Sequence, residues 1–182
     1  MICALAYLVM AVFRIPIIPA LPFLKYDPKD VILMIGGFMY GPIPAVLVIA
    51  VVALVEMVTV SETGIIGCLM NFISSASFVC IAAWIYRKNH TKKGAMIGLL
   101  SGVVFMTVVM LLWNYLITPI YMGYPREAIA AMLLPGFLPF NVIKGSINAG
   151  LTLLLYKPVV TTLRKAGLFP QESLINKDST LV

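Results

Sequence analysis

Three polar residues near the carboxyl end of the chain have the spacing of a binding face. Asn141, Lys144 and Asn148 stand at positions i, i+3 and i+7, which lie on one side of a helix. Pro135 and Pro139 come shortly before them, so this face begins where the helix starts or bends. A membrane helix interrupted by proline and carrying convergent polar groups is typical of a substrate site. The alternative is that Lys144 extends to the membrane surface while the asparagines bridge helices.

Few other polar side chains stand inside apolar runs. Asn114 lies between Trp113 and Tyr115 near the end of its run, so its position fits an interfacial role and a binding role equally well. For Glu56 we expect solvation at the outer end of its helix, and for Asn71 a hydrogen bond between two helices. These residues therefore add Asn114 alone to the candidate site.

The sequence lacks the common catalytic and metal-binding motifs. It contains no GxxxxGK[ST], HExxH or GxSxG pattern, and its one histidine, His90, stands in a basic loop. The three cysteines lie in apolar runs without a CxxC pair, which predicts neither disulfides nor a zinc site: Cys3, Cys68 and Cys80. We predict no enzyme, no cofactor and no metal. A small polytopic membrane enzyme relying on Glu56 or Lys144 is the alternative outside the transport class.

The composition requires a bilayer around these residues. Of 182 residues, 62% are hydrophobic and only 11% are charged, and the mean hydropathy is +1.04. Soluble domains are about 45–50% apolar and about 25% charged. A span uses about 20 residues, so five or six spans of about 100–120 residues in total leave room only for short loops and a tail. We predict an all-α integral membrane protein with a membrane domain over 1–168 and a polar cytoplasmic tail over 169–182.

The apolar runs locate the helices but leave their number open. We expect spans at 1–13, 31–40, 45–58, 65–86, 95–118 and 128–156. The first run is short for a span, which is compatible with a start that lacks a few residues. Ten residues of helix cover about 15 Å, so by length alone 31–40 is either a partial span or a re-entrant piece.

Between the first two runs lies an irregular, apolar loop. Residues 14–30 contain four prolines, each without the amide donor that a helix needs. The end of this loop predicts a helix start with Asp27 as N-cap and Pro28 at the first helical position.

Basic residues set the expected orientation. The loop 87–93 carries four cations and no acid, which places it in the cytoplasm. Lys157, Arg164 and Lys165 follow two spans later and agree with that side, which puts 59–63 and 119–127 outside. The net charge of +6 is thereby explained by membrane orientation, and we predict no nucleic-acid partner.

Several segments together resemble one family, the riboflavin-specific S components of energy-coupling-factor (ECF) transporters, of the RibU type. The resemblance covers nearly the whole chain, and its first and last segments are the most specific. The matching segments are Pro22-Phe23-Leu24-Lys25-Tyr26-Asp27-Pro28-Lys29-Asp30, Ile35-Gly36-Gly37-Phe38 through Gly41-Pro42, Thr63-Gly64 through Asn71-Phe72, Asn114-Tyr115, and Pro139-Phe140-Asn141-Val142-Ile143-Lys144-Gly145.

The resemblance implies a multi-pass protein of the bacterial plasma membrane. It implies six transmembrane helices with both termini in the cytoplasm, and it makes 31–40 a short second helix. It further implies that riboflavin is captured on the outer side, under the irregular first loop, as transported ligand rather than cofactor. The partners would be a transmembrane coupling subunit and two ATPase subunits.

The expected site combines an apolar slot with a few polar contacts. A flat ring system with one polar edge and a sugar-alcohol chain needs such a combination. Leu21, Pro22, Phe23, Leu24 and Tyr26 are expected to form the slot. By similarity to the family, Asn114, Asn141 and Lys144 contact the flavin. The alternatives are another vitamin or flavin mononucleotide, whose phosphate would also suit a cation.

The first helix departs from the family pattern at its expected docking surface. S components carry small residues at four-residue spacing there, whereas this chain offers Ala4, Ala6 and Ala11. Ala4 and Ala11, seven residues apart, share a face. We take these three alanines as the candidate contacts with the coupling subunit.

Overall fold

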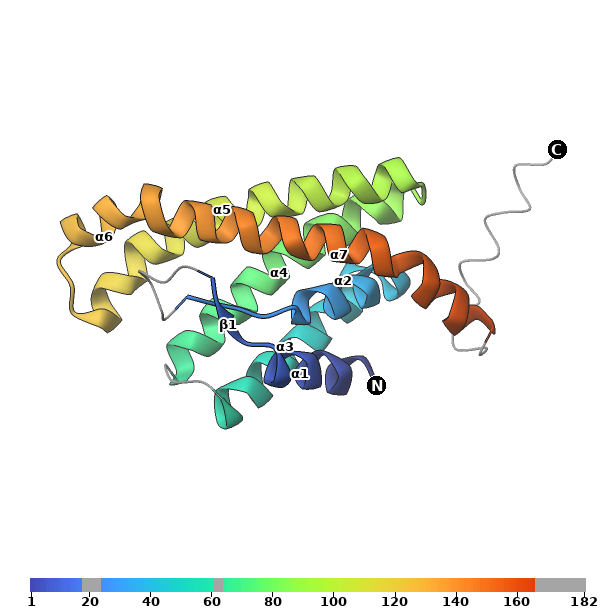
Figure 1. Cartoon of the computed structure of the whole chain (residues 1–182), viewed down its shortest axis with the longest axis horizontal. Coiled ribbons are helices and arrows are strands. Elements are labelled where there is room, and N and C mark those ends of the chain that lie inside the picture. The colour runs from blue at the N-terminus through green and yellow to red at the C-terminus, as the bar shows by residue number, and fades with distance from the viewer. Residues whose placement is uncertain (18–23, 61–63, 166–182) are drawn as a thin grey trace.

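The apolar runs of the sequence form a bundle of helices, with one pair of very short strands. The computed structural model describes residues 1–17, 24–60 and 64–165. In chain order the elements are α1 (Ile2–Val12), β1 (Ile15–Pro16), β2 (Lys25–Tyr26), α2 (Lys29–Tyr40), α3 (Pro42–Thr59), α4 (Gly64–Lys88), α5 (Lys92–Met122), α6 (Arg126–Met132), the π-helical turn η1 (Leu133–Phe137) and α7 (Leu138–Lys165). The class predicted from composition is confirmed, because almost all described residues are helical (Figure 1).

Within the described residues, four helices have the length and composition of a membrane span. They cover Pro42–Thr59, Gly64–Lys88, Lys92–Ile120 and Arg126–Tyr156. The apolar helix α1 has 11 residues and α2 has 12, so each rises less than about 20 Å. Six complete spans, and the cytoplasmic position of both termini, stay predictions.

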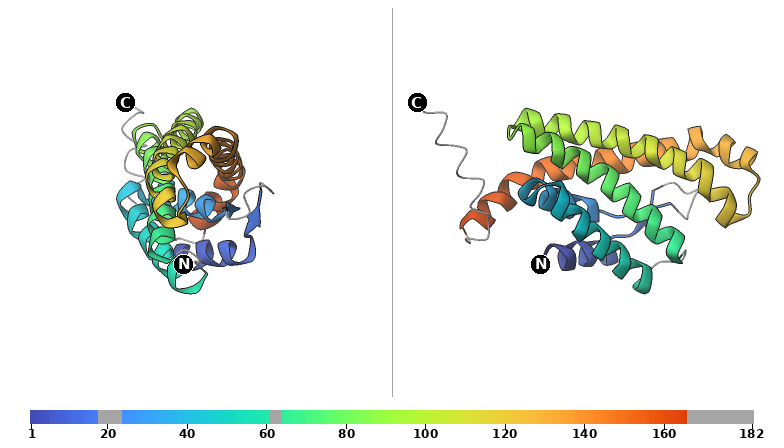
Figure 2. Two further views of the ribbon diagram at one scale, coloured as in Figure 1. Left: turned by 90° about the vertical axis from the view of Figure 1, so that its left-hand side faces the viewer. Right: turned by 180° about the vertical axis from the view of Figure 1, so that it is seen from behind.

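The turns between helices divide between the two ends of the bundle. Figures 1 and 2 show the α4–α5 turn and the carboxyl end of α7 at one end of the bundle. The end of α3, the start of α4 and the α5–α6 turn lie at the other end. The two basic segments of the sequence therefore share an end, as the orientation argument requires. The tail predicted over 169–182 lies outside the described residues.

The break between α2 and α3 follows from two adjacent residues. Gly41 has a φ of +88°, which favours glycine, and Pro42 opens α3 at a position where a missing amide proton costs nothing. The start of α2 differs from expectation: Pro28, not Asp27, is the N-cap residue, and the helix begins at Lys29. The cap prediction was wrong because the Asp27 side chain contacts lysines, as described below, instead of backbone amides.

Close contact between α4 and α5 forms the centre of the main core. A side chain on Gly98 would place its Cβ 2.8 Å from the carbonyl oxygen of Ala82, and one on Gly102 would place it 2.7 Å from that of Phe78. Two glycines four residues apart let helix backbones approach in this way in membranes. Buried residues of α2, α3 and α7 pack around this pair of helices.

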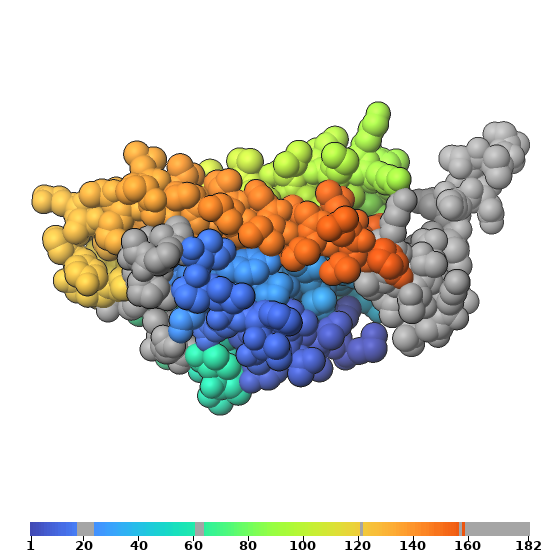
Figure 3. Space-filling model, viewed as in Figure 1, coloured from blue at the N-terminus to red at the C-terminus, as the bar shows by residue number. Residues whose placement is uncertain are grey.

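A second, smaller apolar cluster lies where α6, η1 and α7 meet the first loop. It consists of Leu24, Ile129, Phe137 and Phe140. The two strands pair antiparallel, with Ile15 opposite Tyr26, and this pairing joins the segment after α1 to the segment before α2. On the face seen in Figure 3 the blue N-terminal segment lies directly below the orange surface of α7.

Candidate substrate-binding site

The polar face of the last helix is buried, as its spacing predicted. Asn141, Lys144 and Asn148 are only 3%, 6% and 1% exposed. The prolines that precede them do not interrupt the helix. Instead η1, which contains Pro135, passes directly into α7. A π-helical turn absorbs a misfit in the backbone ladder and is frequent at functional sites.

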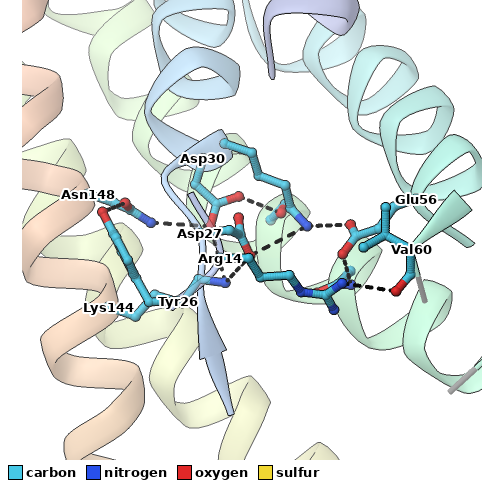
Figure 4. Close-up of polar contacts among 11 residues, drawn as sticks. Arg14, Tyr26, Asp27, Asp30, Glu56, Val60, Lys144 and Asn148 are labelled. Atoms are coloured by element: carbon cyan, nitrogen blue, oxygen red, sulfur yellow. Dashed lines mark hydrogen bonds and ion pairs between the residues drawn. The ribbon is translucent and has the colours of Figure 1, made fainter. Parts of the chain in front are cut away.

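Lys144 does not extend to the membrane surface. Its ammonium nitrogen lies 3.5 Å from Oδ2 of Asp27 and 3.8 Å from Oδ2 of Asp30 (Figure 4). Asn148 on the same face donates to Asp30 Oδ2 at 3.4 Å and accepts from the Tyr26 hydroxyl at 2.9 Å. The interpretation of Lys144 as a surface-seeking side chain was wrong, because two carboxylates compensate its charge inside the protein.

The same network continues to α3 and α4 through Lys29. Its ammonium nitrogen lies 2.5 Å from Glu56 Oε2 and 3.8 Å from Asp27 Oδ2. Asn71 donates to Glu56 Oε1 at 2.9 Å, which confirms the expected hydrogen bond between helices. Glu56 itself is 2% exposed, so the expectation that it is solvated at the outer end of its helix was wrong. It was wrong because Lys29 and Asn71 satisfy both carboxylate oxygens.

Asp30 lies at the centre of the network. It is fully buried and accepts from the Ser75 hydroxyl at 2.5 Å through Oδ1, while Oδ2 faces α7. At the edge of the network Arg14 donates to the Val60 carbonyl at 3.0 Å. Segments far apart in sequence thus converge on the start of α2, as Figure 4 shows.

Carboxylates outnumber ammonium groups among the fully buried members of this network, while the half-buried Arg14 adds a third positive charge at its edge. Its buried members are three carboxylates and two ammonium groups: Asp27, Asp30, Glu56, Lys29 and Lys144. Although burial alone would raise it, the ammonium groups of Lys144 and Lys29 hold the pKa of the Asp27 carboxyl below its ordinary value. Burial, followed by the Asp27 carboxylate, raises the pKa of the Tyr26 hydroxyl to about 12. At neutral pH Tyr26 is therefore a neutral donor and Asp27 a pure acceptor.

One atom of Asp27 has no partner. Among the described residues, Asp27 Oδ1 is the buried side-chain oxygen or nitrogen that lacks a hydrogen bond. Asp27 is 4% exposed, so water does not compensate this oxygen freely. A buried acceptor without a partner costs about 1–3 kcal/mol, which singles out Asp27 as a group with unused binding capacity.

The two candidate asparagines make bonds within their own helices. Asn114 is 3% exposed, donates to the Met110 carbonyl at 2.7 Å and accepts from Thr118 at 2.9 Å. Its burial favours the interior over the interfacial position that the sequence left open. Asn141 donates to the Phe137 carbonyl at 2.7 Å, at the end of η1. Neither residue is hydrogen-bonded to the charged network in this structure.

The apolar part of the expected slot is only partly described. Leu21, Pro22 and Phe23 lie outside the described residues. Leu24 is buried in the cluster with Phe137 and Phe140, and Tyr26 is half-buried beside the charged network. The described part of the slot therefore adjoins both an apolar surface and the polar face of α7.

The three alanines of α1 do not share one surface. Ala4 and Ala11 are exposed, whereas Ala6 is fully buried in the main core. In this arrangement Ala4 and Ala11 alone are available to a partner, and their docking role stays a prediction. Among the described residues there is also no group of His, Cys, Asp and Glu side chains that could hold a metal ion.

Sequence reasoning missed the charged residues of the network. Asp27, Lys29 and Asp30 were taken as parts of a loop and a helix cap, and Ser75 was not considered. A signal was present in the sequence: three charged residues stand directly before an apolar run of ten residues. A helix this short places its first turn inside the protein, where charges need partners.

Comparison with known proteins shows the family. The model of the ECF transporter substrate-specific component matches residues 1–156, and the chain belongs to this family. This family consists of transporter components of the membrane, not of enzymes.

Individual proteins are similar to the chain over most of its length. The chain is 32% identical to the riboflavin transporter FmnP of Bacillus subtilis, over 81% of this chain and 85% of that protein. It is 30% identical to the riboflavin transporter RibU of Staphylococcus aureus, over 91% and 89% of the two chains. A solved structure of the S component of a bacterial ECF transporter superposes with a TM-score of 0.76 at 29% identity, over 90% of this chain and 93% of that one.

Proposed function

We propose that this chain is the substrate-binding subunit that captures riboflavin on the outer side of the plasma membrane for ATP-driven uptake. The observation that carries the proposal is the match, over most of both chains, to two riboflavin transporters of different bacteria. The energy would come from a transmembrane coupling subunit and two ATPase subunits, because the sequence contains no nucleotide-binding motif.

The site supports a ligand that is apolar at one end and polar at the other. Leu24, Phe137 and Phe140 form a buried apolar cluster, and Lys144 lies one turn after Phe140 on the same helix. Asn114, Asn141 and Lys144 are the proposed polar contacts, with Leu21, Pro22, Phe23, Leu24 and Tyr26 as the slot. In this proposal the amides of Asn114 and Asn141 turn from their own helices to the ligand.

Charge favours riboflavin over flavin mononucleotide. Lys144 already faces two carboxylates, and the buried network holds three carboxylates against two ammonium groups. A phosphate beside Lys144 would be repelled by Asp27 and Asp30, which already face that lysine, at low dielectric. A neutral ligand does not meet this repulsion.

Titration of the purified protein tests the proposal. Quenching of flavin fluorescence in detergent should report tight riboflavin binding, and Lys144→Ala or Asn141→Ala should weaken it by about 5- to 150-fold, the equivalent of about 1–3 kcal/mol. Lys93→Ala, at an exposed lysine near the start of α5, is the control and should bind as wild type does. Wild-type affinity in both site variants would remove α7 from the site. Absence of riboflavin binding by the folded wild-type protein would refute the proposed function.

A further inference from the structure

We propose that Asp27 is a specificity-determining residue of the site. Its Oδ1 accepts a hydrogen bond from the imide N–H of the flavin ring, while Lys144 donates to the ring carbonyl next to that N–H. The assignment rests on the proposed function, and it adds to it a carboxylate and the part of the ligand that the carboxylate recognises.

The starting observation is the unpartnered oxygen. Asp27 Oδ2 faces Lys144 at 3.5 Å and Lys29 at 3.8 Å, but Oδ1 has no hydrogen bond although the residue is 4% exposed. An ionised carboxylate only accepts, so the group that completes Oδ1 must be a donor. Hydrogen bonds to a charged acceptor are among the stronger ones, so a donor here contributes substantially to recognition.

The neighbours of Asp27 define the kind of donor. Lys144 offers N–H donors at the same carboxylate, 3.5 Å from Oδ2, the oxygen next to the free acceptor Oδ1. The protein therefore presents an acceptor next to a donor, and the complementary ligand edge is a donor next to an acceptor. An imide has this pattern, since its N–H is flanked by carbonyl groups on both sides. The pyrimidine end of the flavin ring carries an imide.

The orientation of the ring follows from the adjacent apolar cluster. Leu24 stands three residues before Asp27, and Phe140 stands one helical turn before Lys144. Along both segments the chain thus passes from the apolar cluster to the charged pair. The flavin ring has the same polarity along its long axis, from a dimethylbenzene end to an imide end. The apolar end fits against Phe137 and Phe140, which brings the imide to Asp27 and Lys144.

Asp30 allows Asp27 to be replaced without leaving the Lys144 ammonium group unpaired. Its Oδ2 lies 3.8 Å from Lys144, so Lys144 retains a counter-charge when Asp27 is replaced. The variant Asp27→Ala removes the free acceptor, and Asp27→Asn keeps the side-chain shape without the negative charge. Glu127→Gln, which changes an exposed carboxyl of α6, is the matched control.

The experiment combines these variants with three flavins of different chemistry. Riboflavin carries both the imide N–H and the ribityl chain, 3-methylriboflavin lacks the N–H, and lumiflavin lacks the chain. Fluorescence titration of the wild-type protein should show 3-methylriboflavin binding about 5- to 150-fold more weakly than riboflavin. In Asp27→Ala the affinity for riboflavin should fall to nearly that for 3-methylriboflavin, whose own affinity should stay unchanged. Glu127→Gln should keep the wild-type difference.

Other outcomes overturn the assignment without affecting the proposed function. Equal binding of riboflavin and 3-methylriboflavin by the wild-type protein would show that the imide N–H is not recognised. A difference that persists in both Asp27 variants would place its recognition elsewhere. Loss in Asp27→Ala of the preference for riboflavin over lumiflavin, with 3-methylriboflavin still discriminated, would assign Asp27 to the ribityl chain. If Asp27→Ala does not fold, the comparison is made with Asp27→Asn, which should also show a smaller difference between the two riboflavins.

Discussion

The ammonium nitrogen of Lys144 lies 3.5 Å from Oδ2 of Asp27, although the two residues are 117 positions apart in the chain. This contact joins the segment before α2 to the middle of the last helix. Both residues also belong to the proposed ligand site. Changes at this pair should therefore affect the stability of the fold and the binding of ligand together, and the two effects can be separated by measuring each.

Removal of Lys144 should destabilise the protein in the absence of ligand. Lys144→Ala leaves Asp27 and Asp30 buried with less positive charge nearby, and breaking a buried ion pair from one side costs about 3–5 kcal/mol. Thermal unfolding in detergent should show a clearly lower midpoint than wild type. The double variant Lys144→Met with Asp27→Asn should recover part of the loss, because fewer charges are left unpaired. A midpoint equal to that of wild type in Lys144→Ala would contradict the network as described.

The contact between α4 and α5 should tolerate no side chain at Gly102. The Cβ of Gly102→Ala would lie 2.7 Å from the Phe78 carbonyl oxygen, so the helices must separate, at a cost of about 1–3 kcal/mol. Gly150→Ala is the matched control, because nothing lies within 4 Å of a Cβ built at Gly150. It should leave stability unchanged or raise it by up to about 1 kcal/mol through helix propensity. Equal midpoints for the two variants would show that α4 and α5 do not pack closely in the membrane.

The orientation can be tested with single cysteines in a background without the native ones. A cysteine at Lys25 or Tyr124 should react with an impermeant thiol reagent added to intact cells, whereas one at Asn89 should react only after the membrane is opened. Asn89 and Tyr124 are exposed, Asn89 between α4 and α5 and Tyr124 between α5 and α6. Figure 1 shows these two turns at opposite ends of the bundle. Labelling of Asn89 in intact cells would reverse the orientation and place the site on the wrong side for uptake.

Much of this arrangement could be predicted from local sequence patterns. Apolar runs locate the helices because a helix that crosses the hydrocarbon layer needs a run of apolar residues. The spacing of Asn141, Lys144 and Asn148 predicts one shared face because helical geometry is local. The partners of that face could not be predicted, since nothing near Lys144 in sequence indicates that Asp27 and Asp30 meet it. Glu56 was misjudged for the same reason. Its position near a helix end predicted that its carboxylate is solvated. The contact with Lys29, which is made only in the folded structure, keeps that carboxylate buried.

Uptake should require partners. Purified protein alone in vesicles should bind riboflavin without concentrating it, because the chain has no ATP-binding motif and its buried ionisable groups gather at the start of α2. Radiolabelled riboflavin inside vesicles should not exceed the outside concentration beyond the amount bound to protein. Accumulation driven by a sodium or proton gradient, without any other subunit, would replace the present proposal with a carrier.

The position of α2 has a consequence for how the protein is made. Its charged first turn meets Glu56 27 residues later, Ser75 45 residues later and Asn148 118 residues later. A lysine or aspartate alone at the centre of a span costs about 2.5–3.5 kcal/mol at insertion. A nascent chain that has emerged only as far as α2 contains Asp27, which lies 3.8 Å from Lys29, but it lacks the partners that α3, α4 and α7 supply. We expect α2 to enter the bilayer together with α3 and α4, and to reach its final depth only when the ribosome has released α7.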